Sequence, residues 1–198
     1  GVEFKAQSST ANSQQPIAII YDNDVHCAVD GYAKLVALRD IVSDTTDFVT
    51  TVSCGDFASG GVIASVSDGE LIVDIMNKVG YDVVALGNHE LDYGMNQLFA
   101  FSESLDAEVV CANLKNVQTD EFPFPAYHII SYGDVDVAFL GFTTPSSGTV
   151  MSLSDEDGNP LYSFMREDFY SKRHLCCAVD RIMATDDDKC LKSYGEDL

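Results

Sequence analysis

The chain has 198 residues, of which 46% are hydrophobic and 10% aromatic, so it is long enough for one domain with a substantial core and too short for two generous ones. Its 32 acidic residues outnumber its 11 basic residues and give a formal net charge of -21 at pH 7. Such a charge argues against a protein that binds nucleic acid or anionic lipid, and it means that a phosphate-bearing ligand must be met by local positive charge, for which bound metal cations are the natural source.

The first residues and the cysteines give further expectations. Residues 1–15 are rich in Ser, Gln, Asn and Ala, which predicts a flexible polar tether of the kind that follows a removed export signal, and hence an extracellular or cell-envelope protein. No apolar run approaches the length of a membrane span. The first three of the six cysteines follow or lie within apolar runs, and core thiols are expected there rather than disulfides or metal ligands. The six are Cys27, Cys54, Cys111, Cys176, Cys177 and Cys190.

Strands and helices are expected to alternate from about residue 16 onward. The apolar run at residues 17–21 predicts a strand buried on both faces. Residues 31–42 have the apolar spacing of a helix, with Arg39 and Asp40 facing water. The remaining expected elements are strands at 48–52, 83–86, 108–111 and 136–142, and helices at 70–79, with Gly80 as its stop, and at about 95–105. This alternation implies parallel pairing through crossovers and an α/β fold.

Polar side chains follow three successive strands of this predicted sheet. Asp24 and His26 follow the first strand, Asp56 the second, and Asn88 and His89 the third. Ligands of open α/β sheets bind beyond the carboxyl ends of the strands, and a strand spacing of about 4.8 Å would bring neighbouring clusters within reach of a shared ion. In extended backbone Asp24 and His26 would point to the same side. Oxygen ligands mixed with imidazole suit Mn²⁺, Zn²⁺ or Fe, so the pattern favours a metal centre.

An alternative interpretation gives these residues ordinary structural roles. Each Asp or Asn, Asn88 and Asp92 among them, could cap the helix that follows its strand, and His26 could simply face solvent. Three consecutive clusters with different ligand types favour the metal interpretation over the caps. Gly55 and Gly87 fit it as well, because they let the backbone pass close to an ion without a Cβ clash.

The same motifs resemble those of a known family. The segments YDNDVH at residues 21–26, SCGDF at 53–57, and MNKVGYD at 76–82 running into GNHELDYG at 87–94 are similar to motifs of the calcineurin-like metallophosphoesterases, and within them of the 5′-nucleotidase and 2′,3′-cyclic phosphodiesterase family. The likeness covers roughly residues 16–170. It implies the N-terminal part of a metallophosphoesterase domain with a four-layer αββα sandwich, and a hydrolase that acts on nucleotides or small phosphate esters.

The resemblance also implies a mechanism and a set of roles. Two divalent metals, Mn, Zn or Fe, would be bound, and a hydroxide held by a metal would attack phosphorus in line with the leaving group. The implied roles are Asp24 and His26 as ligands of one metal, Asp56 as the carboxylate that bridges both, Asn88 as a ligand of the second, His89 with Asp92 as the catalytic dyad, and Asn113 as a weaker candidate for binding phosphate.

The sequence departs from the family pattern after these motifs. Family members supply further histidine ligands from later motifs, and none of these motifs is present here. Of the other two histidines, His128 is expected to be a satisfied or surface residue, and His174 lies where the likeness stops, at the start of a tail over residues 171–198. The hypothesis that follows is a chain that is the N-terminal part of a longer nucleotidase, with its second metal bound weakly or not at all and its activity weak or absent.

Two function classes remain open at this stage. The first is the 5′-nucleotidase-type hydrolase, and the second is a catalytically silent metal-binding or self-associating module that retains half of the enzyme fold. A sheet without its partner sheet exposes an apolar face, so self-association as a dimer is expected. A P-loop or Rossmann nucleotide-binding module is poorly supported, because neither glycine fingerprint occurs.

Overall fold

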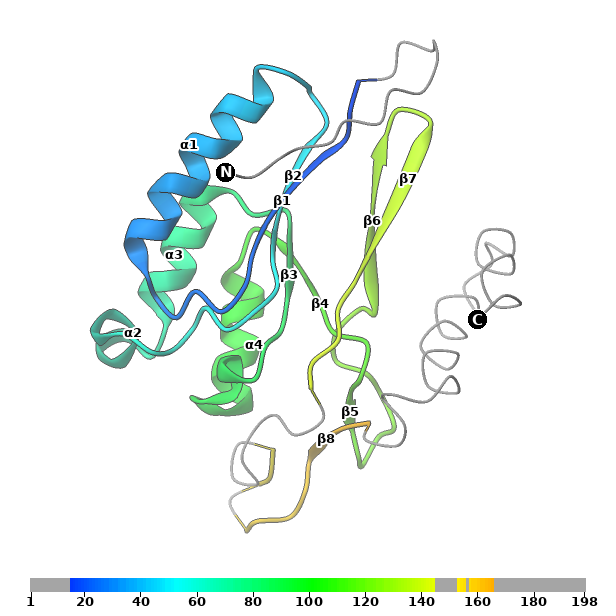
Figure 1. Ribbon diagram of the computed structural model, residues 1–198. Helices are drawn as coiled ribbons and strands as arrows, with labels where there is room; N and C mark the ends of the chain where they lie inside the picture. Colours follow the sequence, from blue (N-terminus) through cyan, green and yellow to red (C-terminus); the bar gives the residue numbers. More distant parts are fainter. Residues whose placement is uncertain (1–14, 145–152, 156, 166–198) are drawn as a thin grey trace.

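The computed structural model describes residues 15–144, 153–155 and 157–165 (Figure 1). Residues 1–14 of the tether predicted at 1–15, and the predicted tail at 171–198 with His174 and the last three cysteines, lie outside the described residues. Four parallel strands form one sheet in the order β1-β2-β3-β4, which confirms the α/β prediction. These strands are β1 (Ala18–Asp22), β2 (Val49–Ser53), β3 (Val83–Ala85) and β4 (Glu108–Val110), and the helices between and after them are α1 (Val29–Ser43), α2 (Val62–Ser67), α3 (Glu70–Val79), the short 3-10 helix η1 (His89–Leu91) and α4 (Gly94–Ser104).

Helices α1, α3 and α4 lie on one side of this sheet, where most of the core sits (Figure 1). Helix α3 buries Ile72, Val73, Met76 and Val79 and ends at Gly80, whose left-handed backbone (φ +79°) lets its N–H bond to the carbonyl of Met76, as predicted. The expectation that the Arg39 side chain faces water was wrong. The Arg39 guanidinium donates to the carbonyls of Val79 and Gly80 at 2.8 and 2.6 Å, because the C-terminal carbonyls of α3 attract a cation.

Strand β1 differs from the prediction of burial on both faces. Ile20 is buried, whereas Ile19 is 46% exposed and Tyr21 is 70% exposed. The physical reason is that β1 is the edge strand of the sheet, and the helices cover the face that holds Ile20 but not the face that holds Ile19 and Tyr21.

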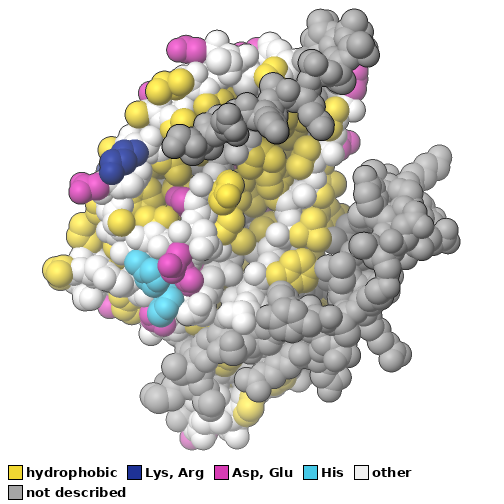
Figure 2. Space-filling model, viewed as in Figure 1, with side chains coloured by type: hydrophobic (Ala, Val, Ile, Leu, Met, Phe, Trp, Pro, Cys, Tyr) yellow, Lys and Arg dark blue, Asp and Glu magenta, His cyan; other side chains and the backbone are white. Residues whose placement is uncertain are grey.

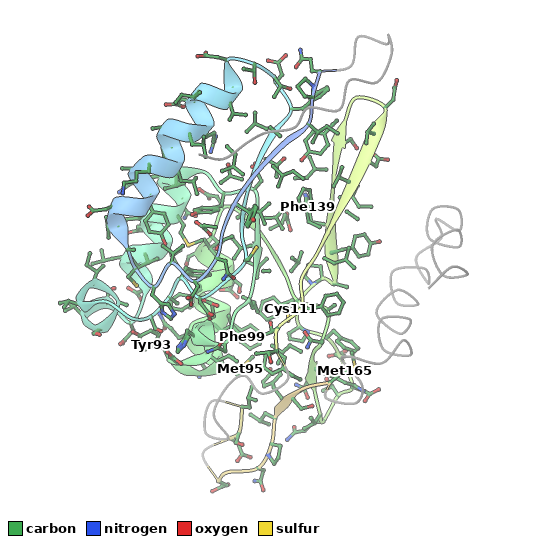
Figure 3. All side chains as sticks on the ribbon, viewed as in Figure 1. Tyr93, Met95, Phe99, Cys111, Phe139 and Met165 are labelled. Carbon is green, nitrogen blue, oxygen red and sulfur yellow. The ribbon has the colours of Figure 1, made fainter. Side chains whose placement is uncertain are left out.

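A β-hairpin lies on the side of the sheet away from the helices (Figure 1). It consists of β6 (Tyr127–Tyr132) and β7 (Val135–Leu140), paired antiparallel across a two-residue Gly-Asp turn. The strand predicted at 136–142 therefore exists but does not join the parallel sheet. Tyr132 bonds to Thr50 of β2, and Phe139 lies on the same face of the hairpin, toward the sheet (Figure 3). A second antiparallel pair joins β5 (Leu114–Asn116) to β8 (Tyr162–Phe164).

Two of the three described cysteines are core thiols. Cys27 and Cys111 are buried thiols, as predicted, whereas Cys54 is exposed. The prediction failed for Cys54 because this residue follows β2 at the point where the chain leaves the sheet for a loop. None of the described helices has both the length and the apolar character that a membrane crossing requires.

Candidate metal centre

The loops that follow β1 and β2 bring three metal-ligating side chains together. Asp24, His26 and Asp56 each offer one ligand atom, and these atoms lie within 4.8 Å of one another. Two backbone hydrogen bonds hold the loops side by side, from the Asp24 N–H to the Gly55 carbonyl at 3.1 Å and from the His26 N–H to the Asp56 carbonyl at 2.9 Å. On the surface, imidazole and acidic side chains gather at one place beside a large apolar area (Figure 2). The donor set suits a divalent cation.

The His26 ring is oriented for ligation through one nitrogen. Its Nδ1 lies 3.0 Å from the carbonyl oxygen of Ser59, which can only accept, so Nδ1 carries the proton. Its Nε2 lies 2.8 Å from a carboxylate oxygen of Asp24. Two lone pairs at this distance repel each other unless a second proton or a cation lies between them. The hydrogen bond from Nδ1 to Ser59 leaves Nε2 to face a cation, and metal-ligating histidines are commonly oriented by such a bond.

The backbone at these positions is in an unusual conformation. Asp24 (φ +60°), His26 (φ +45°), Cys27 (φ +60°) and Asp56 (φ +59°) all lie in the left-handed region, not in the extended conformation that the sequence suggested for Asp24 and His26. Each such residue costs about 1 to 3 kcal/mol, and strain of this kind is concentrated at functional sites. The side chains of Asp24 and His26 therefore come together because the backbone turns at these residues, and not because they alternate along an extended strand.

The loop after β3 packs against the same place. The N–H of His89 donates to Asp56 Oδ1 at 2.8 Å, and the rings of His89 and His26 lie 4.7 Å apart at 70°. A Cβ on Gly87 would lie 2.3 Å from that carboxylate oxygen, and a Cβ on Gly55 would lie 2.2 Å from the nitrogen of Gly87. The two glycines therefore allow the second and third loops to touch. Asn88, the residue after Gly87, is half-buried, and its role as a metal ligand stays a prediction.

The capping alternative does not describe these loops. The N-cap residues of α1, α2 and α4 are Ala28, Gly61 and Tyr93, so neither Asp24 nor Asp56 occupies a cap position. Asn88 occupies the N-cap position of η1 but makes no side-chain capping bond. The polar strand ends are thus not explained as helix caps.

His89 and Asp92 form the pair that the sequence suggested. Nδ1 of His89 lies 2.8 Å from Oδ2 of Asp92, and both side chains are partly exposed. The hydrogen bond to Asp92 raises the pKa of His89 above its ordinary value, and nearby carboxylates act in the same direction while partial burial opposes them. The charged imidazolium therefore persists to higher pH than in a free histidine.

Removing this carboxylate should lower the pKa of His89. In Asp92→Asn the hydrogen bond to a charged acceptor is lost, so the imidazolium should deprotonate at lower pH. The stability that the charge contributes is present below the ordinary pKa of about 6.5 and is lost as pH rises through the raised value, so the variant should lose this dependence. NMR titration of the His89 ring in chelator would measure the change. Asp134→Asn, in the hairpin turn, is the charge-matched control, and an equal shift in both variants would contradict the assignment.

Glu90 is a functional candidate that the sequence analysis missed. Its side chain is fully buried, and its carboxylate accepts hydrogen bonds from four backbone N–H groups, those of Asp56, Phe57, Ala58 and Gly87. Burial raises its pKa, while the bonds from the amides act in the opposite direction. The sequence carries no signal for this role, because a glutamate in a polar motif is usually exposed.

Asn113 does not present its amide to the metal-ligating side chains. It is buried, its Nδ2 donates to the carbonyl of Thr143 at 2.7 Å, and its Oδ1 accepts from the N–H of Thr143 at 3.0 Å. The Thr143 hydroxyl in turn donates to the carbonyl of Leu86 at 2.7 Å. These bonds join Asn113, which follows β4, to Thr143, and through Thr143 to the end of β3. The predicted contact of Asn113 with phosphate stays a prediction. His128 lies in β6 and is not part of the ligand group.

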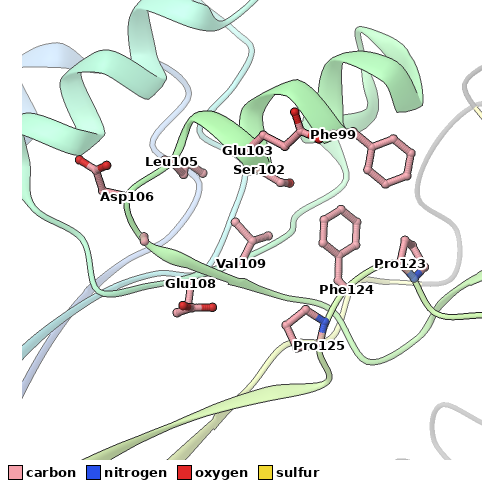
Figure 4. A pocket seen from close by; sticks show the side chains of 11 residues that line it. Phe99, Ser102, Glu103, Leu105, Asp106, Glu108, Val109, Pro123, Phe124 and Pro125 are labelled. Atoms are coloured by element: carbon pink, nitrogen blue, oxygen red, sulfur yellow. The ribbon is translucent and has the colours of Figure 1, made fainter.

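A cleft of about 400 Å³ lies elsewhere on the described part of the molecule, between α4 and the segment around Phe124 (Figure 4). Phe99, Phe124 and three acidic side chains are among the residues that line it. None of its lining residues belongs to the three loops of the metal centre, so this cleft is separate from the candidate site.

The chain is similar to known proteins of one family. Residues 17–175 match the family described as Calcineurin-like phosphoesterase. The chain is 32% identical over 168 residues to a 5′-nucleotidase of Vibrio cholerae, covering 79% of this chain and 29% of that protein, and 29% identical over 180 residues to the endonuclease YhcR of Bacillus subtilis, covering 75% and 15%. It thus spans less than a third of the length of these relatives. Among solved structures, a 5′-nucleotidase precursor from Thermus thermophilus superposes with a TM-score of 0.66 at 24% identity, over 84% of this chain and 34% of that one, and shares the fold.

Proposed function

The chain belongs to the calcineurin-like phosphoesterase family, as the sequence motifs suggested, and from this membership we propose that it is a metal-dependent phosphoester hydrolase of the 5′-nucleotidase type that acts on nucleotides or related phosphate esters. The observation that carries the proposal is the group formed by Asp24, His26 and Asp56. Neighbouring strand ends bring these three side chains, two carboxylates and one imidazole, to one place, and their backbone is strained while none of them caps a helix.

The residues fit a divalent cation of the Mn²⁺, Zn²⁺ or Fe kind. Asp24 and Asp56 would supply oxygen ligands and His26 its Nε2, while Asn88 together with Asp56 would hold a second cation. Such a cation, when bound, polarises a phosphoryl oxygen and lowers the pKa of a water molecule. The described residues offer one group of three acidic or imidazole donors, which is enough for one firmly held cation and leaves the second weakly held or absent.

The side chains of the third loop would act on the substrate. His89 stays protonated to higher pH because of Asp92, so it can donate a hydrogen bond to a phosphoryl oxygen and a proton to the departing alkoxide. Its distance from the ligand group is fixed by the bond from its own N–H to Asp56. In-line phosphoryl transfer requires a bound cation and a proton donor at fixed positions close to each other.

A second function is favoured by the ligand count. A single group of three donors among the described residues also suits a catalytically silent module that binds one cation and does no chemistry. The two functions differ in turnover and not in metal content.

One experiment tests the proposal and separates these alternatives. The purified chain would be dialysed with Mn²⁺ or Zn²⁺, analysed for bound metal, and assayed with an aryl phosphate and with AMP. Bound metal with hydrolysis supports the enzyme, and bound metal without hydrolysis supports the silent module. A protein that retains no metal contradicts both.

The proposed partners are a nucleotide or small phosphate ester and a second copy of the chain, with no nucleic acid. The excess of acidic residues opposes binding to a polyanion, although one relative is named an endonuclease. Export to the cell envelope or the exterior is proposed from the polar first residues and the family likeness.

Self-association is proposed for the uncovered face of β1, where Ile19 and Tyr21 are exposed beside an unpaired strand edge. Analytical ultracentrifugation should show dimers, and Tyr21→Lys should shift them to monomers, because the ammonium would be buried in the contact. Ile41→Lys is the matched control, since Ile41 is also a large exposed apolar residue, on α1, and it should leave the dimers unchanged. A wild-type chain that is monomeric at all concentrations would contradict this proposal.

A further inference from the structure

The buried carboxylate of Glu90 connects two loops of the candidate centre. Its Oε1 accepts from the N–H groups of Phe57 at 2.8 Å and Ala58 at 3.1 Å. Its Oε2 accepts from the N–H groups of Asp56 at 2.9 Å and Gly87 at 2.7 Å. Three of these donors belong to the loop that carries Asp56, and the fourth belongs to the loop that carries His89.

A buried carboxylate contributes little net free energy to the stability of a fold. Removing a carboxylate from water is unfavourable unless it is fully hydrogen-bonded, and an apolar side chain of similar size would often serve stability as well. Glu90 nevertheless has no exposed surface, and its four acceptor positions match the four amide donors. No cationic side chain is among these partners, and all four donors are main-chain groups whose positions define the two loops.

We propose that Glu90 is a positioning residue that fixes the loop of Asp56 against the loop of His89, and thereby sets the separation between the metal-holding carboxylate and the proton donor. The inference rests on the proposed function for its consequence but not for its geometry. The backbone bond from His89 to Asp56 and the contact between Gly55 and Gly87 form only when the two loops keep this alignment.

Replacing Glu90 should weaken metal binding beyond any loss of stability. Glutamine offers a single acceptor oxygen and turns its NH₂ group toward two of the amide donors, so the loops should separate. Glu90→Gln should lower the affinity for Mn²⁺, measured by titration calorimetry, by about 10- to 100-fold, as loss of an outer partner does at metal sites. The NMR signal of the His89 amide should move as well.

Leu98→Ala is the control for a merely structural effect, because Leu98 is a buried core residue of α4 outside the three loops. It should reduce the melting temperature while leaving the Mn²⁺ affinity and the His89 amide signal unchanged. A folded Glu90→Gln protein with wild-type Mn²⁺ affinity would overturn the proposal.

Hydrogen exchange in the wild-type protein decides the question if the variant does not fold, or if the wild type binds no Mn²⁺ and the proposed function therefore fails. The amides of Asp56, Phe57, Ala58 and Gly87 should exchange slowly and at a common rate, since one carboxylate holds all four. Rates that are scattered and as fast as those of open loops would refute the positioning role.

Discussion

Replacing Asp56 by asparagine is expected to lower the affinity for Mn²⁺ by at least about 100-fold and to abolish phosphoester hydrolysis. Mutation of outer partners alone costs about 10- to 100-fold at metal sites, and Asp56 is itself one of the three grouped ligands. One oxygen of its carboxylate, Oδ1, lies next to Gly87 and accepts the hydrogen bond from the His89 N–H. Asparagine keeps the shape and an acceptor oxygen but removes the charge that neutralises a cation.

The substitution has a closely matched control. Asp68 is another aspartate with a left-handed backbone (φ +48°), and its side chain is exposed outside the three loops. Asparagine tolerates this conformation, so Asp68→Asn should keep wild-type metal binding and turnover. Titration calorimetry with Mn²⁺ and an aryl-phosphate assay would measure both variants. Undiminished Mn²⁺ binding by Asp56→Asn would remove Asp56 from the metal centre.

Replacing His89 by alanine is expected to lower turnover by about 10²- to 10⁴-fold, the usual contribution of a positioned acid or base. The affinity for Mn²⁺ should change little, because the bond to Asp56 comes from the backbone N–H of residue 89 and is retained in the variant. The pair with Asp92 is lost, so no protonated imidazole remains for the leaving group.

The control for this variant is His128→Ala. His128 lies in β6, outside the ligand group, and its removal should leave turnover unchanged. Steady-state rates with AMP and an aryl phosphate at saturating Mn²⁺ would separate the two variants. A His89→Ala protein as active as the wild type would show that the proton donor is another residue.

Local patterns in the sequence predicted the elements whose own residues determine them. Helix α3 with its stop at Gly80 followed from one apolar stripe and one glycine, and β2 followed from a β-branched run. The convergence of polar strand ends followed from a general rule for parallel sheets. For these features, short-range physical chemistry is sufficient.

Features that depend on long-range neighbours were missed. The exposure of Tyr21 depends on where β1 lies in the sheet. The guanidinium of Arg39 donates to the carbonyl of Val79, which lies 40 residues further along the chain. The antiparallel pairing of β7 was within reach of the sequence, because a Gly-Asp turn between two apolar runs is a hairpin signal. The hydrogen bonds of Glu90 could not be predicted, because the residues next to it in the sequence do not distinguish it from an exposed acidic residue.

The charge of the site suggests an order of binding. Asp24, Asp56, Glu90 and Asp92 place negative charge around the two histidines, which attracts cations and repels free phosphate esters. A substrate phosphate should therefore bind only after a cation has neutralised the ligands. The metal centre is on this account a condition for substrate binding as well as for hydrolysis.

Anomalous diffraction from crystals soaked in Mn²⁺ tests most directly whether the first two strand ends jointly hold a divalent cation. The expected result is a manganese peak in contact with an oxygen of Asp24, Nε2 of His26 and an oxygen of Asp56. A peak elsewhere on the chain, or none at millimolar Mn²⁺ with the three side chains in place, would contradict the metal centre and the phosphoesterase function proposed from it.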